Sequence, residues 1–352
     1  MTENRKDAHV RLAVAQHVEV PAPRLGRGGG ASPAARPGGF DDVRFVHHAL
    51  AGIDREQVDL RTTVLGRAWT TPLYINAMTG GTAETGRINR SLAIAARETG
   101  LAIATGSMSP YLKDESTAGT FSPVRDEYPD GFVMANLNAN ATPEQARRAV
   151  GLIEADALQI HLNPVQEIVM PEGDRSFGHW AGSIEAIVKA LDVPVIVKEV
   201  GFGLSGRTVA LLAELGVAAA DVAGSGGTDF ARIENGRREH GDYAYLEGWG
   251  LSTPAALLDA RDQGLPLLAS GGVRHPLDVA RALALGARAV GASGPFLTTL
   301  VTDGLDALVA RITTWIDQLT ALMTILGARR TGDLTACDIQ LGDSLSRAAG
   351  SR

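Results

Sequence analysis

Short apolar runs alternate with helical stretches from residue 70 onwards, and this repeat constrains the fold more than any other feature. Eight runs are apolar on both faces, as in strands buried between two layers. The runs are Pro72–Asn76, Leu101–Thr105, Phe132–Asn136, Ala157–His161, Pro194–Lys198, Val217–Val222, Pro266–Ser270 and Arg288–Ala292. Their alternation with helical stretches predicts parallel βαβ units.

Most of the gaps between these runs have helical period. The helical stretches are Arg87–Thr99, Pro143–Glu154, Ser183–Leu191, Gly206–Glu214, Thr253–Gln263 and Pro276–Leu285. Eight strands with no strong sign of a second domain favour an α/β fold of the (β/α)8 TIM-barrel type over a doubly wound sheet. We expect a helix over 303–327 to close it. Residues 1–70 then form an N-terminal extension or cap, 71–330 the barrel and 331–352 a C-terminal tail.

Composition and charge narrow the class of protein. The net charge of −7, without a long basic run, argues against nucleic acid as a partner. The single cysteine, Cys337, excludes an internal disulfide and suits a reducing cytoplasm. No signal-like or membrane-spanning apolar stretch occurs. Residues 21–39, rich in Gly, Pro and Ala, read either as a mobile loop or lid or as an inert linker.

Polar residues stand at or just after the carboxyl ends of the eight predicted strands. They are Asn76, Thr105, Asn136, His161, Lys198, Ser225, Ser270 and Ser293. In a barrel these ends share one rim, where the active sites of such enzymes lie. The long charged loop 224–250 is expected to fold over this rim.

Glycine-rich turns after the last strands point to a phosphate site. They are Ala223–Thr228, Ala269–Arg274 and Val290–Pro295. Glycines let backbone N–H groups approach an anion, and the loops after strands seven and eight form the usual barrel phosphate site. The alternative is that they are only tight turns. No early GxGxxG follows a strand, so the loops favour flavin mononucleotide (FMN) over a dinucleotide.

Lys198, at the end of the fifth run, needs an anionic partner if it is buried. A flavin ring suits it; a Schiff-base role and a simple pair with Glu199 are the alternatives.

The stretch 161–175, HLNPVQEIVMPEGDR, concentrates imidazole, amide, carboxylate and guanidinium groups at a strand end. With other segments it resembles the type 2 isopentenyl-diphosphate isomerases, which are FMN- and Mg-dependent barrels. The matching segments include Arg5–His9, Phe40–His48, Ile75–Gly81, Gly106–Ser107, Ala135–Leu137, Val197–Gly203, Gly226–Asn235 and Ser270–Arg274. NPxQE followed by PEGDR, and FARIEN, are the most specific of them.

The resemblance implies a role for each matched residue. The flavin is lined by Ala77, Met78, Thr79, Ser107, Asn136, Lys198 and Thr228, and its phosphate is held by Gly271, Gly272, Val273, Ala292 and Ser293. The substrate diphosphate faces Arg5, Lys6, His9, His161 and Asn163; Gln166 lies beside the alkene, and Gln166, His161 and Lys198 form the catalytic set. Glu167 carries Mg²⁺, which typically joins one or two carboxylates to phosphate oxygens; a solvated loop carboxylate is the alternative. Glu172, Asp174 and Arg175 are expected to form a local ion-pair turn.

The implied reaction converts isopentenyl to dimethylallyl diphosphate without net redox change. A reduced flavin can supply both proton steps, with NADPH needed only as its reductant. We expect a cytoplasmic homo-oligomer, a tetramer or octamer, that does not engage nucleic acid or membrane.

The chain departs from the family mainly on the substrate side. Met108 and Ser109 stand where the family has Gln-Arg, and that Arg grips the diphosphate. Ala8 replaces Glu, Asn138 replaces Gly, and Asp229 brings a carboxylate near the phosphate loops. An alternative function is therefore a flavin-dependent cyclase or isomerase acting on a longer prenyl diphosphate such as geranyl diphosphate, because the lost Arg would open apolar room. A flavin oxidase of 2-hydroxy acids and a non-catalytic flavin-binding protein are further alternatives.

Overall fold

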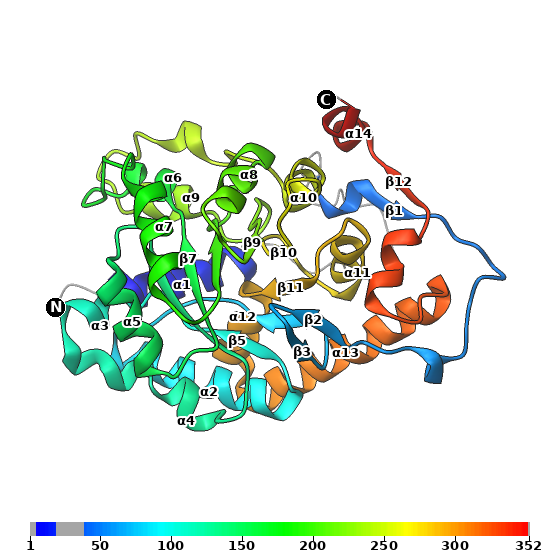
Figure 1. The fold of residues 1–352 in the computed structure, drawn as a ribbon, viewed down its shortest axis with the longest axis horizontal. Helices are drawn as coiled ribbons and strands as arrows, with labels where there is room; N and C mark the ends of the chain where they lie inside the picture. Colours follow the sequence, from blue (N-terminus) through cyan, green and yellow to red (C-terminus); the bar gives the residue numbers. More distant parts are fainter. Residues whose placement is uncertain (1–4, 19–38, 351–352) are drawn as a thin grey trace.

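The computed structural model describes residues 5–18 and 39–350. In that part of the chain, eight short parallel strands form a closed barrel (Figure 1). The strands are β4 (Leu73–Ile75), β5 (Ala102–Ala104), β6 (Val133–Asn138), β7 (Ala157–His161), β8 (Val195–Lys198), β9 (Ala219–Asp221), β10 (Leu267–Ala269) and β11 (Ala289–Ala292). They pair in chain order, and β11 returns to β4 with Ala292 opposite Ile75. The predicted (β/α)8 barrel is confirmed.

Alternate residues of the strands pack into two separate apolar clusters. One cluster fills the barrel and is built mainly from small residues around Tyr74, Met134, Ile196 and Leu268. The other lies between the strands and the surrounding helices. Both faces of each strand are thus buried, which explains why the runs are continuously apolar.

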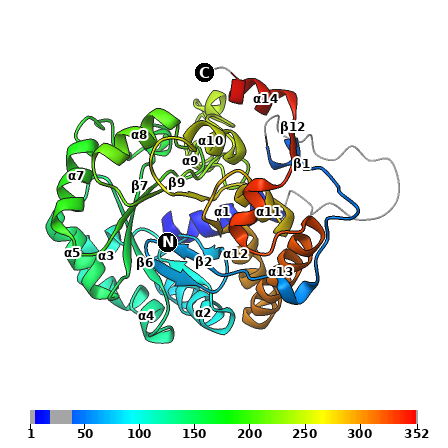
Figure 2. The same ribbon diagram turned by 45° about the vertical axis from the view of Figure 1, so that its right-hand side comes forward.

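The predicted helical stretches correspond to helices that surround the barrel as a ring (Figure 2). They are α2 (Ala83–Thr99), α5 (Pro143–Leu152), α7 (Trp180–Ala190), α8 (Gly206–Glu214), α10 (Thr253–Ala260) and α11 (Pro276–Ala284). Helix α2 begins four residues earlier than predicted because the Thr82 side chain caps it by accepting from the backbone N–H of Thr85. After α12 (Gly294–Asp303), the long helix α13 (Leu305–Leu326) packs against α2, α11 and α12.

Several short helices in the connections at the carboxyl ends of the strands were not predicted. They are α3 (Ser109–Lys113), η3 (Glu115–Thr120), α4 (Pro123–Glu127), α6 (Pro164–Val169), α9 (Phe230–Asn235) and η4 (Ala244–Leu246). The long loop 224–250 is therefore partly helical, because the Asp229 carboxylate accepts from the Arg232 N–H and starts α9.

The two segments that flank the barrel meet each other. The N-terminal one contains η1 (Phe40–Asp42), β1 (Val43–Phe45), η2 (Arg55–Gln57), β2 (Thr62–Val64) and β3 (Arg67–Trp69), and the C-terminal one η5 (Thr331–Ala336), β12 (Ile339–Leu341) and α14 (Asp343–Gly350). Strand β1 pairs antiparallel with β12, so the predicted extension and tail share one small sheet. The hairpin β2–β3 places Trp69 against Tyr74 and Phe132, which belong to the barrel-filling cluster.

Helix α1 (Arg5–Val18) lies across the centre of the helical ring in Figure 2 and contacts α2, α9 and α12. The predicted mobile loop 21–39 lies outside the described residues except for Gly39. No helix within residues 5–18 and 39–350 is both long and apolar enough to cross a membrane.

Candidate active site

A cavity of about 540 Å³ opens at the carboxyl ends of the barrel strands and is roofed by α1. Every residue to which the family resemblance assigned a role in binding or catalysis lines this one cavity. These residues are Arg5, Lys6, His9, Ala77, Met78, Thr79, Ser107, Asn136, His161, Asn163, Gln166, Glu167, Lys198, Thr228, Gly271, Gly272, Val273, Ala292 and Ser293. The fold therefore brings together side chains that are up to 288 positions apart in the sequence, Arg5 and Ser293.

The loops after β9, β10 and β11 form a glycine cradle, which we define as Gly226–Thr228, Gly271–Val273 and Ser293–Gly294. Gly271 and Gly272 have φ of +87° and +71°, and a Cβ on Gly271 would collide with the carbonyl of Gly224. Only glycine tolerates both conditions. The N–H groups of Gly272 and Val273 have no acceptor among the described residues, so the cradle holds backbone donors ready for an anion.

A buried carboxylate, Asp221, anchors the polar floor of the cavity. It accepts hydrogen bonds from the Tyr74 hydroxyl at 2.7 Å, from the Ser270 hydroxyl at 2.9 Å and from the Asn76 amide at 3.2 Å. Burial and the nearby Asp221 charge raise the pKa of Tyr74 well above its usual value. Tyr74 therefore stays protonated and donates. Asp221 was missed in the sequence, although an acidic residue inside the apolar run Val217–Val222 was a visible signal.

Amide side chains extend this floor from Asn76 to His161. Gln159 donates to the Oδ1 of Asn76 at 3.4 Å, and Asn136 donates to the Oε1 of Gln159 at 3.1 Å. The Oδ1 of Asn136 then lies 2.8 Å from the Nδ1 of His161. Because this oxygen only accepts, His161 carries its proton on Nδ1 and leaves a lone pair on Nε2. Gln159 was also missed in the sequence.

The electrostatic surroundings keep His161 neutral. Burial, followed by the charges of Lys198 and Lys6, lowers the pKa of His161 to about 3. Burial likewise lowers the pKa of Lys198, against the opposing influence of Asp221. Burial and the neighbouring Arg5 charge lower the pKa of Lys6 to about 8. An anion in the cavity would favour the charged form of all three groups.

Lys198 does not pair with the carboxylate of Glu199, the simpler alternative considered from the sequence. Its Nζ donates to the backbone carbonyl of Glu199 at 2.7 Å. The Glu199 carboxylate instead accepts from the N–H groups of Val200, Gly201 and Phe202. Burial nevertheless raises the pKa of Glu199 to about 7. The ammonium of Lys198 therefore remains available at the cavity wall.

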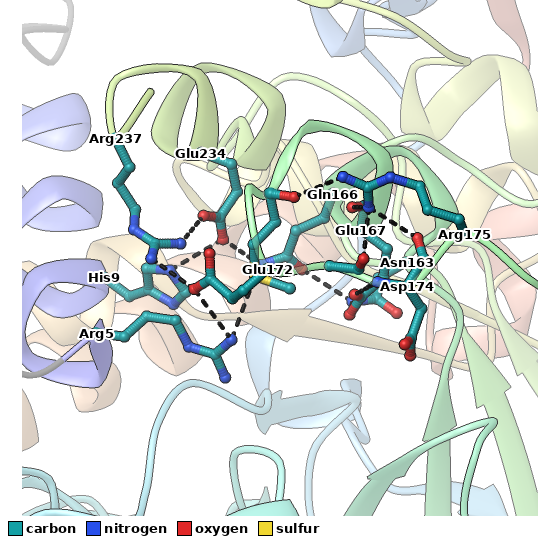
Figure 3. A network of polar contacts seen from close by, with 12 residues as sticks. Arg5, His9, Asn163, Gln166, Glu167, Glu172, Asp174, Arg175, Glu234 and Arg237 are labelled. Atoms are coloured by element: carbon teal, nitrogen blue, oxygen red, sulfur yellow. Dashed lines mark hydrogen bonds and ion pairs between the residues drawn. The ribbon is translucent and has the colours of Figure 1, made fainter. Parts of the chain in front are cut away.

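Glu234, fully buried in α9, connects three elements around the cavity (Figure 3). It accepts from the Gln166 amide at 2.9 Å, forms an ion pair with Arg237, and lies 3.0 Å from the Nε2 of His9 in α1. Burial alone would raise the pKa of Glu234, but the contacts with His9, Gln166 and Arg237 outweigh it and lower the pKa to about 2. Glu234 lies in the quoted FARIEN segment but was not assigned a site role.

Glu167 and Asn163 form the acidic corner of the cavity (Figure 3). The Oε1 of Glu167 accepts from the Asn163 amide at 2.9 Å, and its Oε2 from the N–H of Asp174 at 2.8 Å. The buried Oδ1 of Asn163 has no hydrogen-bond partner. Among the described residues, no three His, Cys, Asp or Glu side chains gather to hold a metal.

The prediction that Glu172, Asp174 and Arg175 form a local ion-pair turn is wrong, because these residues pair with other groups. Arg175 donates to backbone carbonyls, those of Glu167, Met170 and Gly173, and so braces the loop that carries Glu167. Glu172 pairs instead with Arg237 at 2.6 Å and Arg5 at 3.7 Å (Figure 3). The loop that carries Glu172 thus contacts α1 through Arg5 and the end of α9 through Arg237.

The departures from the family take up unexpected positions. Met108 is fully buried in the core and does not line the cavity, so any room left by the lost Arg lies at Ser109. Ser109 does line the cavity and lies 3.0 Å from the Ser107 hydroxyl. Lys113, one turn further along α3, lines it too and was missed. The Asp229 carboxylate turns away, accepting from the N–H groups of Arg232 and Gly248.

Solved structures with a similar fold include a mandelate oxidase and a flavocytochrome b2. A mandelate oxidase variant carrying a monooxide FMN adduct is similar with a TM-score of 0.63 at 19% identity, covering 94% of this chain and 99% of that one. A flavocytochrome b2 variant is similar with a TM-score of 0.64 at 20% identity, covering 87% of this chain and 77% of that one. At these identities the likeness is one of fold alone.

Sequence comparison is more specific. Residues 125–341 match the FMN-dependent dehydrogenase family. The chain is 63% identical to the isopentenyl-diphosphate delta-isomerase of Streptomyces sp. strain CL190, over 97% of this chain and 90% of that protein. It is 64% identical to the isopentenyl-diphosphate delta-isomerase of Kitasatospora griseola, over 95% of this chain and 88% of that protein. It is 42% identical to the enzyme of the same name from Listeria innocua, over 99% of this chain and 94% of that protein. The chain therefore belongs to the isopentenyl-diphosphate delta-isomerase family, and with it to the FMN-dependent dehydrogenase family.

Proposed function

We propose that the protein is an isomerase that converts isopentenyl diphosphate to dimethylallyl diphosphate with FMN and Mg²⁺. One observation carries the proposal: a single cavity holds the glycine cradle at one end and Gln166 and Glu167, facing the cations Arg5 and Lys6, at the other. A flavin phosphate suits the first end and a metal-bound diphosphate the second. The names of the relatives at 56–64% identity support the same activity.

The cradle residues fit FMN. The acceptor-free N–H groups of Gly272 and Val273 need oxygen atoms, and a phosphate supplies them. The strand-end residues Ala77 to Thr79, Ser107 and Asn136 would line the ring, with Lys198 as the cation beside it. When bound in its reduced form, with NADPH as reductant, FMN supplies an electron-rich ring whose nitrogens exchange protons.

The acidic corner fits Mg²⁺. Glu167 offers a carboxylate and Asn163 an unpaired amide oxygen, both hard ligands of the kind this ion prefers. Two protein oxygens leave most of the coordination shell to water and to the substrate diphosphate, which is the usual arrangement for Mg²⁺ at phosphates. Bound there, Mg²⁺ would neutralise diphosphate charge.

Gln166 would position the reacting alkene. Its Nε2 donates to Glu234 and its Oε1 accepts from Asn163 at 3.2 Å, so both ends of the amide are fixed. An amide cannot serve as a general acid at neutral pH, whereas a rigid amide can restrict where the substrate carbons lie. The side chain therefore orients the substrate and does not supply the proton.

Arg5, Lys6 and His161 would hold the diphosphate. Arg5 and Lys6 are adjacent on the first turn of α1 and line the cavity. The negative charge of the diphosphate would raise the lowered pKa of Lys6 and of His161, so that both become donors as the substrate binds. Substrate binding and the docking of α1 are thereby linked.

The alternative, a longer prenyl diphosphate, has one observation in its favour: Ser109, and no arginine, faces the cavity from α3. Two observations weigh against it. Met108 is buried in the core and adds no apolar surface to the cavity, and Lys113 returns a cation to the same face of α3. The five-carbon substrate is therefore the preferred one.

An assay panel tests the proposal. Protein supplied with FMN, Mg²⁺ and NADPH or dithionite is given isopentenyl, geranyl and farnesyl diphosphate separately, and the expected product is dimethylallyl diphosphate alone. Isopentenyl diphosphate left unchanged would contradict the proposal, and turnover of geranyl diphosphate alone would favour the alternative. Bleaching of the flavin by lactate or glycolate would instead indicate a hydroxy-acid oxidase, and bound flavin without any turnover a binding protein.

We further propose that the protein acts in the cytoplasm as a homo-oligomer, a tetramer or octamer. The single cysteine is consistent with a reducing compartment, and light scattering of the FMN-loaded protein measures its mass.

A further inference from the structure

The last turn of α1 is fixed beside the glycine cradle. The Gln16 side chain accepts from the backbone N–H of Asp229 at 3.0 Å and donates to the carbonyl of the same residue at 3.3 Å. This paired contact resembles one rung of a β-ladder and leaves little freedom of rotation or sliding. The residue after Gln16 is thereby directed towards Thr228, the neighbour of Asp229 in the chain.

That residue is His17, and its imidazole lies on the cradle. The Nε2 of His17 is 3.4 Å from the Thr228 hydroxyl. A Cβ added to Gly294, the first residue of α12, would collide with the same ring. His17 also lines the cavity together with Gly272 and Ser293. The imidazole thus meets a loop after β9 and the start of the helix after β11.

Within residues 5–18 and 39–350, His17 is the one side chain at the cradle that could carry positive charge. Among the described residues that line the cavity from the loops after β9, β10 and β11, none is Lys or Arg. The cavity cations Arg5, Lys6, Lys113 and Lys198 come from the first turn of α1, from α3 and from β8. Among the described residues, a phosphate in the cradle would otherwise meet only backbone N–H groups and hydroxyls.

We propose that His17 is a ligand of the FMN phosphate and that, through it, FMN binding holds α1 in place over the site. The proposal rests on the proposed use of FMN. In the free protein, burial lowers the pKa of His17. A phosphate monoester carries close to two negative charges at neutral pH, which oppose that effect and favour an imidazole that donates through Nε2.

Comparison of FMN with riboflavin isolates the phosphate, because the two share the ring and differ in that group. Their affinities for protein stripped of flavin are measured by fluorescence quenching, for the wild type, His17→Ala and His17→Gln. We expect His17→Ala to weaken FMN binding about tenfold, which equals about 1.4 kcal/mol, and to leave riboflavin binding unchanged. His17→Gln keeps an N–H donor and should recover part of the loss. His240→Ala, an exposed histidine outside the cavity, is the matched control.

Limited trypsin digestion tests whether FMN binding holds α1 in place. Cleavage after Arg11 in α1 should be suppressed by FMN in the wild type, but much less in His17→Ala, and riboflavin should protect neither. Equal losses of FMN and riboflavin affinity in His17→Ala would make His17 merely structural, and tighter FMN binding would make it an obstacle; either result overturns the proposal. A wild-type protein that binds neither flavin would overturn the proposed function itself. Thermal unfolding of each variant checks that it is folded.

Discussion

The two ends of the cavity are built in contrasting ways. The glycine cradle is made of backbone from three successive βα loops, and its shape depends on positive φ angles such as that of Gly271. The acidic corner and its surroundings are made of side chains from α1, α6 and α9, joined through Glu234 and Glu172. The backbone of the first end is in place once the barrel closes, and α1 adds the His17 imidazole to it. The second end takes several of its side chains from α1 itself, so its shape depends on how α1 is docked.

The largest effect should come from Glu167→Gln. It removes the carboxylate proposed for Mg²⁺ and should lower turnover at least about 100-fold, because loss of a supporting partner alone typically costs 10- to 100-fold. The flavin spectrum should not change, since the cradle lies at the other end. Turnover is measured across a Mg²⁺ titration.

Glu185→Gln makes the same chemical change on the surface of α7, where Glu185 pairs with Lys189, and serves as its control. Unaltered Mg²⁺-dependent turnover in Glu167→Gln would remove the metal from this corner.

Lys198→Ala tests whether one side chain connects the two ends. It removes a buried cation that is influenced by the Asp221 charge and is proposed to lie beside the ring, and we expect FMN affinity to fall about tenfold. The visible spectrum of the remaining bound flavin should shift. Fluorescence titration and absorbance measure both. The control is Lys189→Ala, on an exposed helix face, which should change neither the FMN affinity nor the flavin spectrum. If Lys198→Ala also changes neither, Lys198 has no role at the ring.

Glu234→Gln weakens the side-chain end alone. The neutral amide keeps the volume but loses the charge that faces His9 and Arg237, and bonds to charged groups contribute roughly 1.5–3 kcal/mol. We expect about 2 kcal/mol less stability in urea unfolding at pH 7. Because the folded pKa of Glu234 is lowered to about 2, this stabilisation is present above the ordinary Glu pKa and is lost as pH falls towards 2.

The difference between wild type and Glu234→Gln should therefore shrink steadily below about pH 4.5. A difference that stays constant down to pH 2.5 would mean that the Glu234 charge is not its source.

Ser109→Arg should have the smallest effect. It restores the family's arginine at the proposed diphosphate site and so tests whether position 109 contacts the diphosphate. A guanidinium on α3 can bind phosphate oxygens bidentately, so KM for isopentenyl diphosphate should fall about threefold. Lys113 already supplies a cation on this face, which limits the gain. Steady-state kinetics of the double variant Ser109→Arg, Lys113→Met would separate the contribution of the new arginine to KM from that of Lys113. A raised KM in the single variant would show that position 109 does not face the diphosphate.

The parts of the molecule that depend on local sequence could be predicted. All eight strands begin and end within two residues of the predicted runs, because strands buried on both faces must be continuously apolar. The glycine cradle followed from the same reasoning, since its residues directly follow those strands. Loop 224–250 was harder, because a single capping side chain, Asp229, starts a six-residue helix that no periodicity announces.

The remaining features depend on contacts between distant segments. Nothing in the pattern of Arg5–Val18 indicates that His9 meets Glu234 or that His17 meets Thr228. The pairing of β1 with β12 depends on where the barrel carries the two ends of the chain. Family resemblance assigned α1 to the site, whereas sequence periodicity by itself did not.

The small sheet of β1 and β12 has a consequence for how the protein comes apart. Val43 and Leu341 are paired partners, so the ladder closes a loop of roughly 300 residues around the whole barrel. Separating either strand leaves the other as an unpaired edge. Release of one strand therefore exposes the other, and hydrogen exchange should show both strands opening as a single cooperative unit.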